Sequence, residues 1–177
     1  MNALKFLIKY IDLGLPSGTL WAEANLPNKH CLKDVLHDLH DAVPTLEEFK
    51  ELFEHCKFKW DRKRVGYKVT GPNGNSIFLP VEGREILYFY TGVQSPGAIS
   101  RVCDNGPNES NPECRVGYYW TSTLFRDESH RLNACFVEFN QNYRNTEGVK
   151  HTCNPHFLYN EYMSVRTVKR RTCYEPW

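Results

Sequence analysis

The sequence predicts an α+β domain with its helices early in the chain and its strands late. Two segments of the first third, residues 30–43 and 45–56, carry apolar residues at the 3.6-residue period of a helix. The rest of the chain contains short aromatic and β-branched runs that are separated by Gly, Pro and Asn, as in antiparallel sheets. Aromatic residues make up 14% of the 177 residues, which excludes a disordered chain. No internal repeat or boundary is evident, so we expect a single domain over residues 1–177.

The N-terminal part is predicted to form two extended segments. Residues 11–15 alternate between apolar and polar or small side chains, which is the period of a strand. A Pro-Ser-Gly turn at residues 16–18 then leads into a second extended run over residues 19–24. Trp21 in this run is expected to anchor the core.

Two helices are predicted next. In residues 30–43 one apolar face recurs at positions i, i+3, i+4 and i+7, through Leu32, Val35, Leu36 and Leu39. The second helix is expected to begin after Thr45, because Thr45 and Glu48 fit the S/T-x-x-E capping box. Its core-facing stripe is Leu46, Phe49, Leu52, Phe53 and Cys56.

The glycine-rich stretch GYKVTGPNGNSIFLP, residues 66–80, is predicted to be a β-hairpin. Asn73-Gly74 lies between two strand-like runs and favours a type I′ turn, in which both central residues have positive φ. A phosphate-binding loop would instead continue into a helix that begins with Lys and Ser or Thr. Residues 75–80 have neither feature, so the stretch is interpreted as scaffold.

Further strands are expected over residues 85–90, 118–121, 134–139 and 163–168. Residues 92–117 are rich in Pro, Gly, Asn and Ser and are predicted to be a long surface loop. Cys103 and Cys114 flank part of this loop. Two alternatives remain for them: a disulfide that closes the loop, or two reduced thiols.

Five stretches give the chain a family resemblance: YIDLGLPSGTLWAEAN, PTLEEFKEL, GYKVTGPNGNSIFLP, GYYWTST and the late SVRTV. In this order they resemble the Fibrobacter succinogenes major paralogous domain family. The resemblance spans most of the chain, although residues 30–43 are shorter than the matching family segment and residues 95–115 look like an insertion. It implies a C-type-lectin-like fold, with paired N- and C-terminal strands, two helices, and a distal sheet that carries long loops.

The late part of the chain is the predicted ligand-binding surface. Along residues 134–139, one strand face would join the core while the other, with Phe136 and Glu138, would meet a ligand. Tyr and Asn dominate the surrounding residues, as in antibody paratopes, although an ordinary polar surface remains the alternative. The candidate binding residues are Asn133, Phe136, Glu138, Asn140, Asn142, Tyr143, Asn145, His156, Tyr159 and Asn160. The family resemblance adds the targets of diversity-generating retroelements, in which such a stretch varies between copies.

Neither a metal nor a cofactor is predicted. The loop DNGPNESNPE, residues 104–113, is rich in the oxygen donors that calcium accepts. The sugar-binding C-type lectins use a Glu-Pro-Asn triplet and a later Trp-Asn-Asp, and neither occurs here. His37 and Asp41 are spaced for one helix face, but four zinc ligands are not evident, so a solvated face is favoured.

The charge and motif content narrow the class of function. A net charge of +1 argues against a nucleic-acid binder, and the cationic run at residues 169–171 is interpreted as a solvated tail. No apolar run reaches the length of a membrane helix, so no membrane insertion is expected. Arg166 is interpreted as structural, with Asp12 or Glu138 as its partner. Trp120 is expected to be a core anchor.

No catalytic residue is predicted, since the serine-hydrolase, zinc-protease and nucleotide-binding motifs are all missing. We therefore expect a non-enzymatic module that binds a protein or glycan outside the cell, or on a cell or virion surface. Because no signal peptide is visible, a cytoplasmic location stays open. Two alternatives stay open. One is a cysteine-dependent enzyme related by fold to the formylglycine-generating enzymes, and the other is a structural domain of a surface assembly. The oligomeric state is not predicted.

Overall fold

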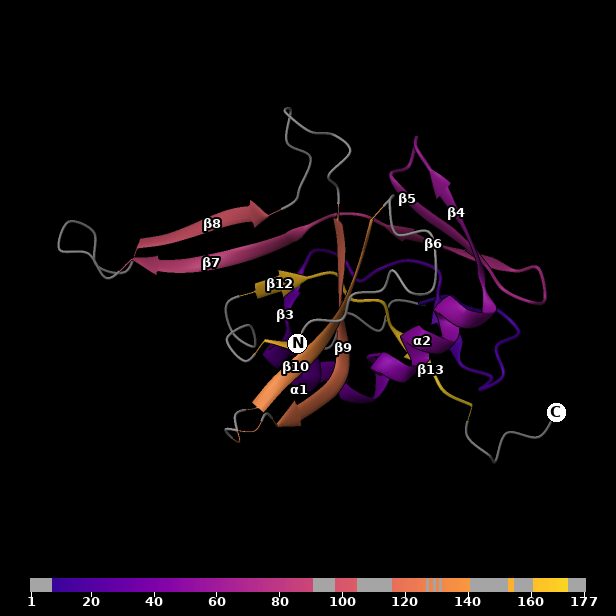
Figure 1. The fold of residues 1–177 in the computed structure, drawn as a ribbon, viewed down its shortest axis with the longest axis horizontal. Helices are drawn as coiled ribbons and strands as arrows, with labels where there is room; N and C mark the ends of the chain where they lie inside the picture. Colours follow the sequence, from indigo (N-terminus) through magenta and orange to yellow (C-terminus); the bar gives the residue numbers. More distant parts are fainter. Residues whose placement is uncertain are drawn as a thin grey trace.

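The fold was analysed on a computed structural model, which describes residues 8–90, 98–104, 116–126, 128, 130, 132–140, 153–154 and 161–171. Figure 1 shows an α+β arrangement in which two short helices lie beside several small sheets. The α+β class and the early position of both helices are as predicted. The elements are β1 Tyr10–Asp12, β2 Leu20–Ala22, β3 His30–Cys31, α1 Leu32–Leu39, η1 His40–Ala42, α2 Leu46–His55, β4 Lys57–Asp61, β5 Gly66–Thr70, β6 Ser76–Pro80, β7 Arg84–Tyr90, β8 Ala98–Asp104, β9 Val116–Arg126, β10 Leu132–Asn140, β11 Cys153–Asn154, β12 Glu161–Met163 and β13 Val168–Lys169.

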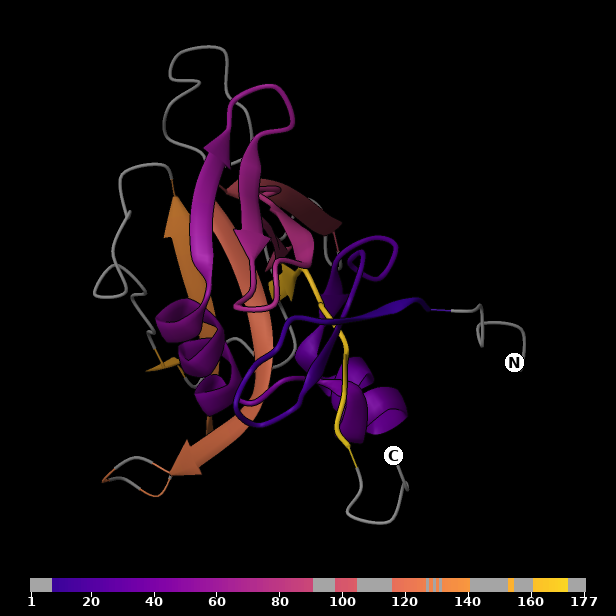
Figure 2. The same cartoon turned by 90° about the vertical axis from the view of Figure 1, so that its right-hand side faces the viewer.

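All strand pairs within the sheets of the described chain are antiparallel. The strand orders are β1-β2-β13, β11-β10-β9, β3-β12-β7-β8 and β4-β5-β6. Since β2 pairs with β13 through Trp21 and Val168, an N-terminal and a C-terminal strand are paired as predicted. Figure 2 shows the yellow C-terminal strand beside the indigo N-terminal segments.

The long strands β9 and β10 separate two hydrophobic clusters. Side chains on one face of the pair, among them Tyr119 and Phe139, pack with α2 and the β4–β6 sheet. Side chains on the other face, among them Trp120 and Phe136, pack with α1. Both views show the two helices on opposite sides of β9. Because both faces are covered, this strand pair forms the central wall of the molecule.

The second helix begins where the sequence predicts, whereas the first helix is shorter than predicted. The Thr45 hydroxyl accepts from the Glu48 amide at 3.1 Å, and a Glu48 carboxylate oxygen accepts from the Thr45 amide at 2.7 Å. This confirms the capping box. The first helix is shorter than predicted, because residues 30–31 form β3 and residues 40–42 tighten into a 3-10 turn.

The hairpin of residues 66–80 is confirmed, but the predicted type I′ turn is wrong. Gly74 has φ +86°, whereas Asn73 is not at positive φ. The Gly74 amide donates to the Gly71 carbonyl at 3.0 Å, and the Gly71 amide donates to the Asn75 carbonyl at 2.9 Å. The connection is therefore a three-residue loop that ends in a left-handed glycine.

The turn of this hairpin binds the N-terminal strand. The side-chain amides of Asn73 and Asn75 both donate to the Asp12 carbonyl, at 2.9 and 2.8 Å. A Cβ on Gly71 would lie 2.0 Å from the Leu13 carbonyl oxygen, so only glycine allows this approach. These contacts agree with the scaffold interpretation of the stretch.

Three strand predictions are corrected. Strand β1 ends at Asp12, and residues 163–168 divide into the end of β12, an isolated bridge and β13. Residues 98–104, predicted as loop, form β8, whose short alternating run was obscured by the Pro-, Gly- and Asn-rich sequence on either side. In the described part of the chain, no helix is long and apolar enough to cross a membrane.

Candidate functional site

The predicted binding surface is described only along β10. Asn133, Phe136, Glu138 and Asn140 belong to this strand. The other candidates, Asn142, Tyr143, Asn145, His156, Tyr159 and Asn160, lie outside the described residues, as do residues 105–113 of the loop rich in oxygen donors, for which no calcium site is predicted.

Phe136 faces the core, so its predicted role as a ligand contact is wrong. Its side chain is 2% exposed, and its ring lies 6.0 Å from that of Tyr118 and 6.1 Å from that of Trp120. The sequence pattern correctly separated the two faces of β10. The face of β10 that carries Phe136 packs in a hydrophobic cluster with Leu32 and Val35 of α1. The alternation of residues along β10 could not show that this face is covered.

The end of β10 retains partly exposed polar residues. Glu138 and Asn140 are both half-buried and lie opposite Tyr118 and Val116 of β9. The Asn140 carbonyl accepts a hydrogen bond from the Tyr67 hydroxyl at 2.9 Å, which ties the end of this strand to the β4–β6 sheet.

Four strand ends meet near this point. Asp104, the last residue of β8, pairs with Arg84, and the adjacent Gly83 bridges Gly117 of β9. Asn140 of β10 pairs with Val116, the first residue of β9. Glu161, the first residue of β12, pairs with Ile86 and forms an ion pair with Arg84. The residues that flank segments 105–115 and 141–160 are thus fixed around one point, Arg84.

The Arg84–Glu161 ion pair is largely withdrawn from solvent. The Arg84 Nη1 to Glu161 Oε2 distance is 3.1 Å, and the side chains are 18% and 0% exposed. The Arg84 guanidinium also lies 4.9 Å from the centre of the Tyr118 ring. Removing one member of a buried ion pair is costly because the other charge stays desolvated, so the pair helps to fix β7 against β12.

A second candidate site is a cavity of about 770 Å³ that sequence reasoning missed. It lies between the loop of residues 23–29, strands β6 and β7, and the C-terminal part of the chain. Its polar lining includes Asn25, Lys29, Arg64, Glu82, Glu85 and Arg166. These residues come from distant parts of the sequence, so no local sequence motif predicts the cavity.

Arg166 lies beneath this cavity and is fully buried. The prediction that Arg166 pairs with Asp12 or Glu138 is wrong. Its guanidinium donates to the Ala22 carbonyl at 3.0 Å and to the Phe78 carbonyl, both of them main-chain acceptors. Arg166 therefore joins β2 to β6 of the hairpin, so its structural role stands but its partners differ from those predicted.

The phenol of Tyr119 lies in the same polar cluster. Its hydroxyl donates to the Pro80 carbonyl at 2.7 Å and accepts from the Asn25 side-chain amide at 3.1 Å. Burial raises the pKa of Tyr119 to about 12, although the nearby Arg166 charge opposes this shift. Burial likewise lowers the pKa of the Arg166 guanidinium. Tyr119 is therefore a neutral hydrogen-bonding group at neutral pH.

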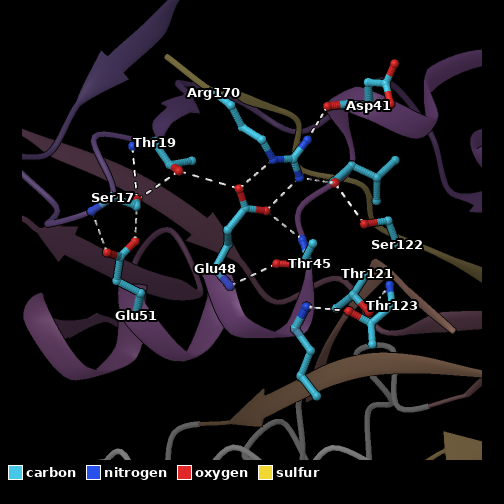
Figure 3. Close-up of polar contacts among 12 residues, drawn as sticks. Ser17, Thr19, Asp41, Thr45, Glu48, Glu51, Thr121, Ser122, Thr123 and Arg170 are labelled. Atoms are coloured by element: carbon cyan, nitrogen blue, oxygen red, sulfur yellow. Dashed lines mark hydrogen bonds and ion pairs between the residues drawn. The ribbon is translucent and has the colours of Figure 1, made fainter. Parts of the chain in front are cut away.

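Figure 3 shows a polar network at the N-terminal end of α2 that serves the scaffold. The Glu48 carboxylate accepts from Arg170 through two nitrogens, each at 2.8 Å, and from the Thr45 amide. Arg170 also donates to the carbonyls of Asp41 and Val43. Each carboxylate oxygen of Glu48 accepts hydrogen bonds within the fold, so the network holds the segment after β13 against α2.

The cationic run at residues 169–171 is therefore not simply a solvated tail. Arg170 binds Glu48, and Arg171 donates to the Asp12 carboxylate at 2.6 Å. Both arginines fasten the C-terminal segment to earlier parts of the chain. Local sequence composition could not identify these partners, which lie more than 100 residues away.

Two cysteines of the described chain are poorly suited to nucleophilic chemistry. Burial raises the pKa of the Cys56 thiol to about 11, and it also raises the pKa of the Cys31 thiol. A raised pKa keeps a thiol protonated at neutral pH, and the thiolate is the reactive form.

The helix-face histidines pair with neighbouring aspartates. The ring of His37 contacts Asp38 and that of His40 contacts Asp41, while the His37 side chain is 85% exposed. Among the described residues, no three His, Cys, Asp or Glu side chains lie close enough to hold a metal ion together.

Comparison with known proteins identifies no relative: no family model, no curated protein and no solved structure matches this chain.

Proposed function

We propose that the chain is a non-catalytic ligand-binding module with a C-type-lectin-like fold. It recognises a protein or glycan on the outside of a cell or virion through its late surface, residues 133–160 without the buried side chains of β10 such as Phe136. The observation that carries the proposal is the meeting of four strand ends around Arg84. A stretch rich in Asn and Tyr is thereby attached at both ends to a rigid, buried base, as binding loops on a scaffold are.

The finer assignment of fold rests on the family resemblance and agrees with several features of the chain. The N-terminal strands β1 and β2 share a sheet with β13, in which β2 pairs directly with β13, and the helices lie early. The tryptophans of two resemblance motifs, Trp21 and Trp120, are both fully buried. The motifs thus fall on scaffold residues, which leaves the stretch after Trp120 available to differ between copies in a retroelement target.

The cysteine-dependent enzyme is the weaker alternative. Cys31 and Cys56 have raised pKa values, and a catalytic thiol needs a lowered one. The structural-assembly alternative uses the same late surface as a subunit interface. It predicts stable association of the purified chain, which size-exclusion chromatography coupled to light scattering would detect.

The test is a binding screen of the purified protein against glycan and surface-protein arrays, in calcium and in chelator. A test variant carries Tyr143, Asn145, His156 and Tyr159 replaced by Ala. A control variant carries Ala at His37, His55 and Lys59, which are exposed on α1, α2 and β4. We expect a ligand that is lost only in the test variant and is kept in chelator. The proposal would be refuted if no ligand is found, or if the ligand binds the four-residue variant as tightly as the wild-type protein.

A further inference from the structure

The cavity beside Arg166 has charged walls whose partners can be assigned one by one. Lys29 lies 3.5 Å from Glu85, and Glu23 lies 2.9 Å from Lys9, so these charges are already compensated. Three charged lining residues take part in no ion pair within the described chain: Arg64, Glu82 and Arg166. The cavity therefore retains two cationic groups and one anionic group.

Arg64 has the geometry of a ligand-binding guanidinium. Its Cζ atom lies 3.7 Å from the centre of the Phe78 ring, so one face of the group is fixed by stacking. Among the described residues no acceptor contacts its side-chain N–H groups, which remain free along the guanidinium edge. Such a pre-oriented fork matches the two oxygens of a carboxylate.

The backbone beside Arg64 is unusual. Val65 has φ +51°, a left-handed conformation that is unfavourable for a β-branched residue. Two hydrogen bonds hold this turn: the Asp61 carboxylate accepts from the Arg64 amide at 3.1 Å, and the Val65 carbonyl accepts from the Val81 amide at 3.0 Å. The fold thus maintains a strained conformation that sets Arg64 at the cavity.

Glu82 supplies an acceptor in the same cavity. Its Oε2 atom accepts from the Ser164 hydroxyl at 3.1 Å and from the Asn25 amide at 3.4 Å, and within the described chain Oε1 accepts no hydrogen bond. The buried Oδ1 atom of Asn25 also has no hydrogen-bond partner among the residues that the structure describes. A ligand that carries hydroxyl groups beside its carboxylate can donate to Glu82 while Arg64 holds the carboxylate.

From these contacts we propose that the cavity binds a small hydroxycarboxylate of the sugar-acid class, with Arg64 on the carboxylate and Glu82 on a hydroxyl. Arg166 lies beneath the site and adds a fixed positive charge. The paired charges Lys29 and Glu85 form part of the wall. This site is separate from the late surface, so either proposal can fail without the other.

Isothermal titration calorimetry with D-glucuronate tests the site. Glucuronate is expected to bind the wild-type protein with a dissociation constant in the millimolar range or below. Its methyl ester, which lacks the charge, and N-acetylglycine, which lacks the hydroxyls, are expected to bind at least about tenfold more weakly. Equal binding of N-acetylglycine and glucuronate would overturn the role of the hydroxyls.

Matched variants locate the binding. Arg64→Gln and Glu82→Gln are each expected to weaken glucuronate binding at least about tenfold. Arg62→Gln removes the same charge from an exposed residue of the same turn that does not line the cavity, and it should leave binding unchanged. Absence of glucuronate binding to the wild-type protein, or equal losses in Arg62→Gln and Arg64→Gln, would overturn the proposal.

Discussion

Arg84 and Glu161 form an ion pair, 3.1 Å between Nη1 and Oε2, in which the Glu161 side chain is fully buried. The pair joins β7 to β12 at the place where the residues flanking segments 105–115 and 141–160 come together. The residues that flank the proposed binding surface are therefore held together in part by a contact between residues that are 77 positions apart.

Replacing Glu161 by Ala is expected to lower the free energy of unfolding by about 3–5 kcal/mol, because Arg84 would lose this ion pair but keep the desolvation cost of its largely buried charge. Urea denaturation followed by circular dichroism measures the change. Glu23→Ala is the control, since the Lys9–Glu23 pair is exposed and is worth at most about 1 kcal/mol. Similar losses in the two variants would contradict a special role for the buried pair.

Two glycines of one hairpin turn are expected to differ sharply in their tolerance of alanine. A Cβ on Gly71 would lie 2.0 Å from the Leu13 carbonyl oxygen, so Gly71→Ala must displace the N-terminal strand. Gly74 has open space around it, and its φ of +86° gives Gly74→Ala a strain of only about 1–2 kcal/mol. Thermal unfolding should give a clearly larger loss for Gly71→Ala. The opposite order would mean that the hairpin does not pack on Leu13.

Glu48 combines two roles that substitutions can separate. Glu48→Gln keeps an acceptor for the Thr45 amide but weakens the contact with Arg170, whereas Glu48→Ala removes both. We expect Glu48→Ala to be more destabilising than Glu48→Gln. Thr45→Ala removes the other half of the capping box and should cost about 1 kcal/mol. Equal unfolding free energies for Glu48→Ala and the wild type would refute the network.

Burial of the Cys56 thiol makes the stability of the fold decrease at alkaline pH. Its thiol has a pKa of about 11 in the folded protein, compared with an ordinary value of 9.0. Between these values the unfolded chain loses the proton while the folded chain keeps it, so this contribution to stability is full below pH 9 and is lost as the pH rises toward 11. Denaturation at a series of pH values should show a smaller alkaline loss in Cys56→Ala. An unchanged loss would contradict the assignment.

The features that the sequence predicted correctly depend on neighbouring residues. The capping box of Thr45 and Glu48, the stripe of α2 and the hairpin of residues 66–80 are all encoded within a few positions. The errors concern partners that only the folded chain brings together. Arg166 binds carbonyls of residues 22 and 78, and Phe136 is covered by a helix a hundred residues earlier. The cavity around Arg64 and Glu82 is lined by residues from five separate stretches of the chain, so no short sequence pattern predicted it.

The most direct test of the binding-module account is the dissociation constant of the ligand found in the screen, measured for matched variants. The account predicts that replacing Tyr143, Asn145, His156 and Tyr159 by Ala raises the constant at least about tenfold. Chelator and the control changes at His37, His55 and Lys59 should leave it unaffected, because these three residues lie on other elements. A constant that is the same for the four-residue variant and the wild type would contradict recognition through the late surface.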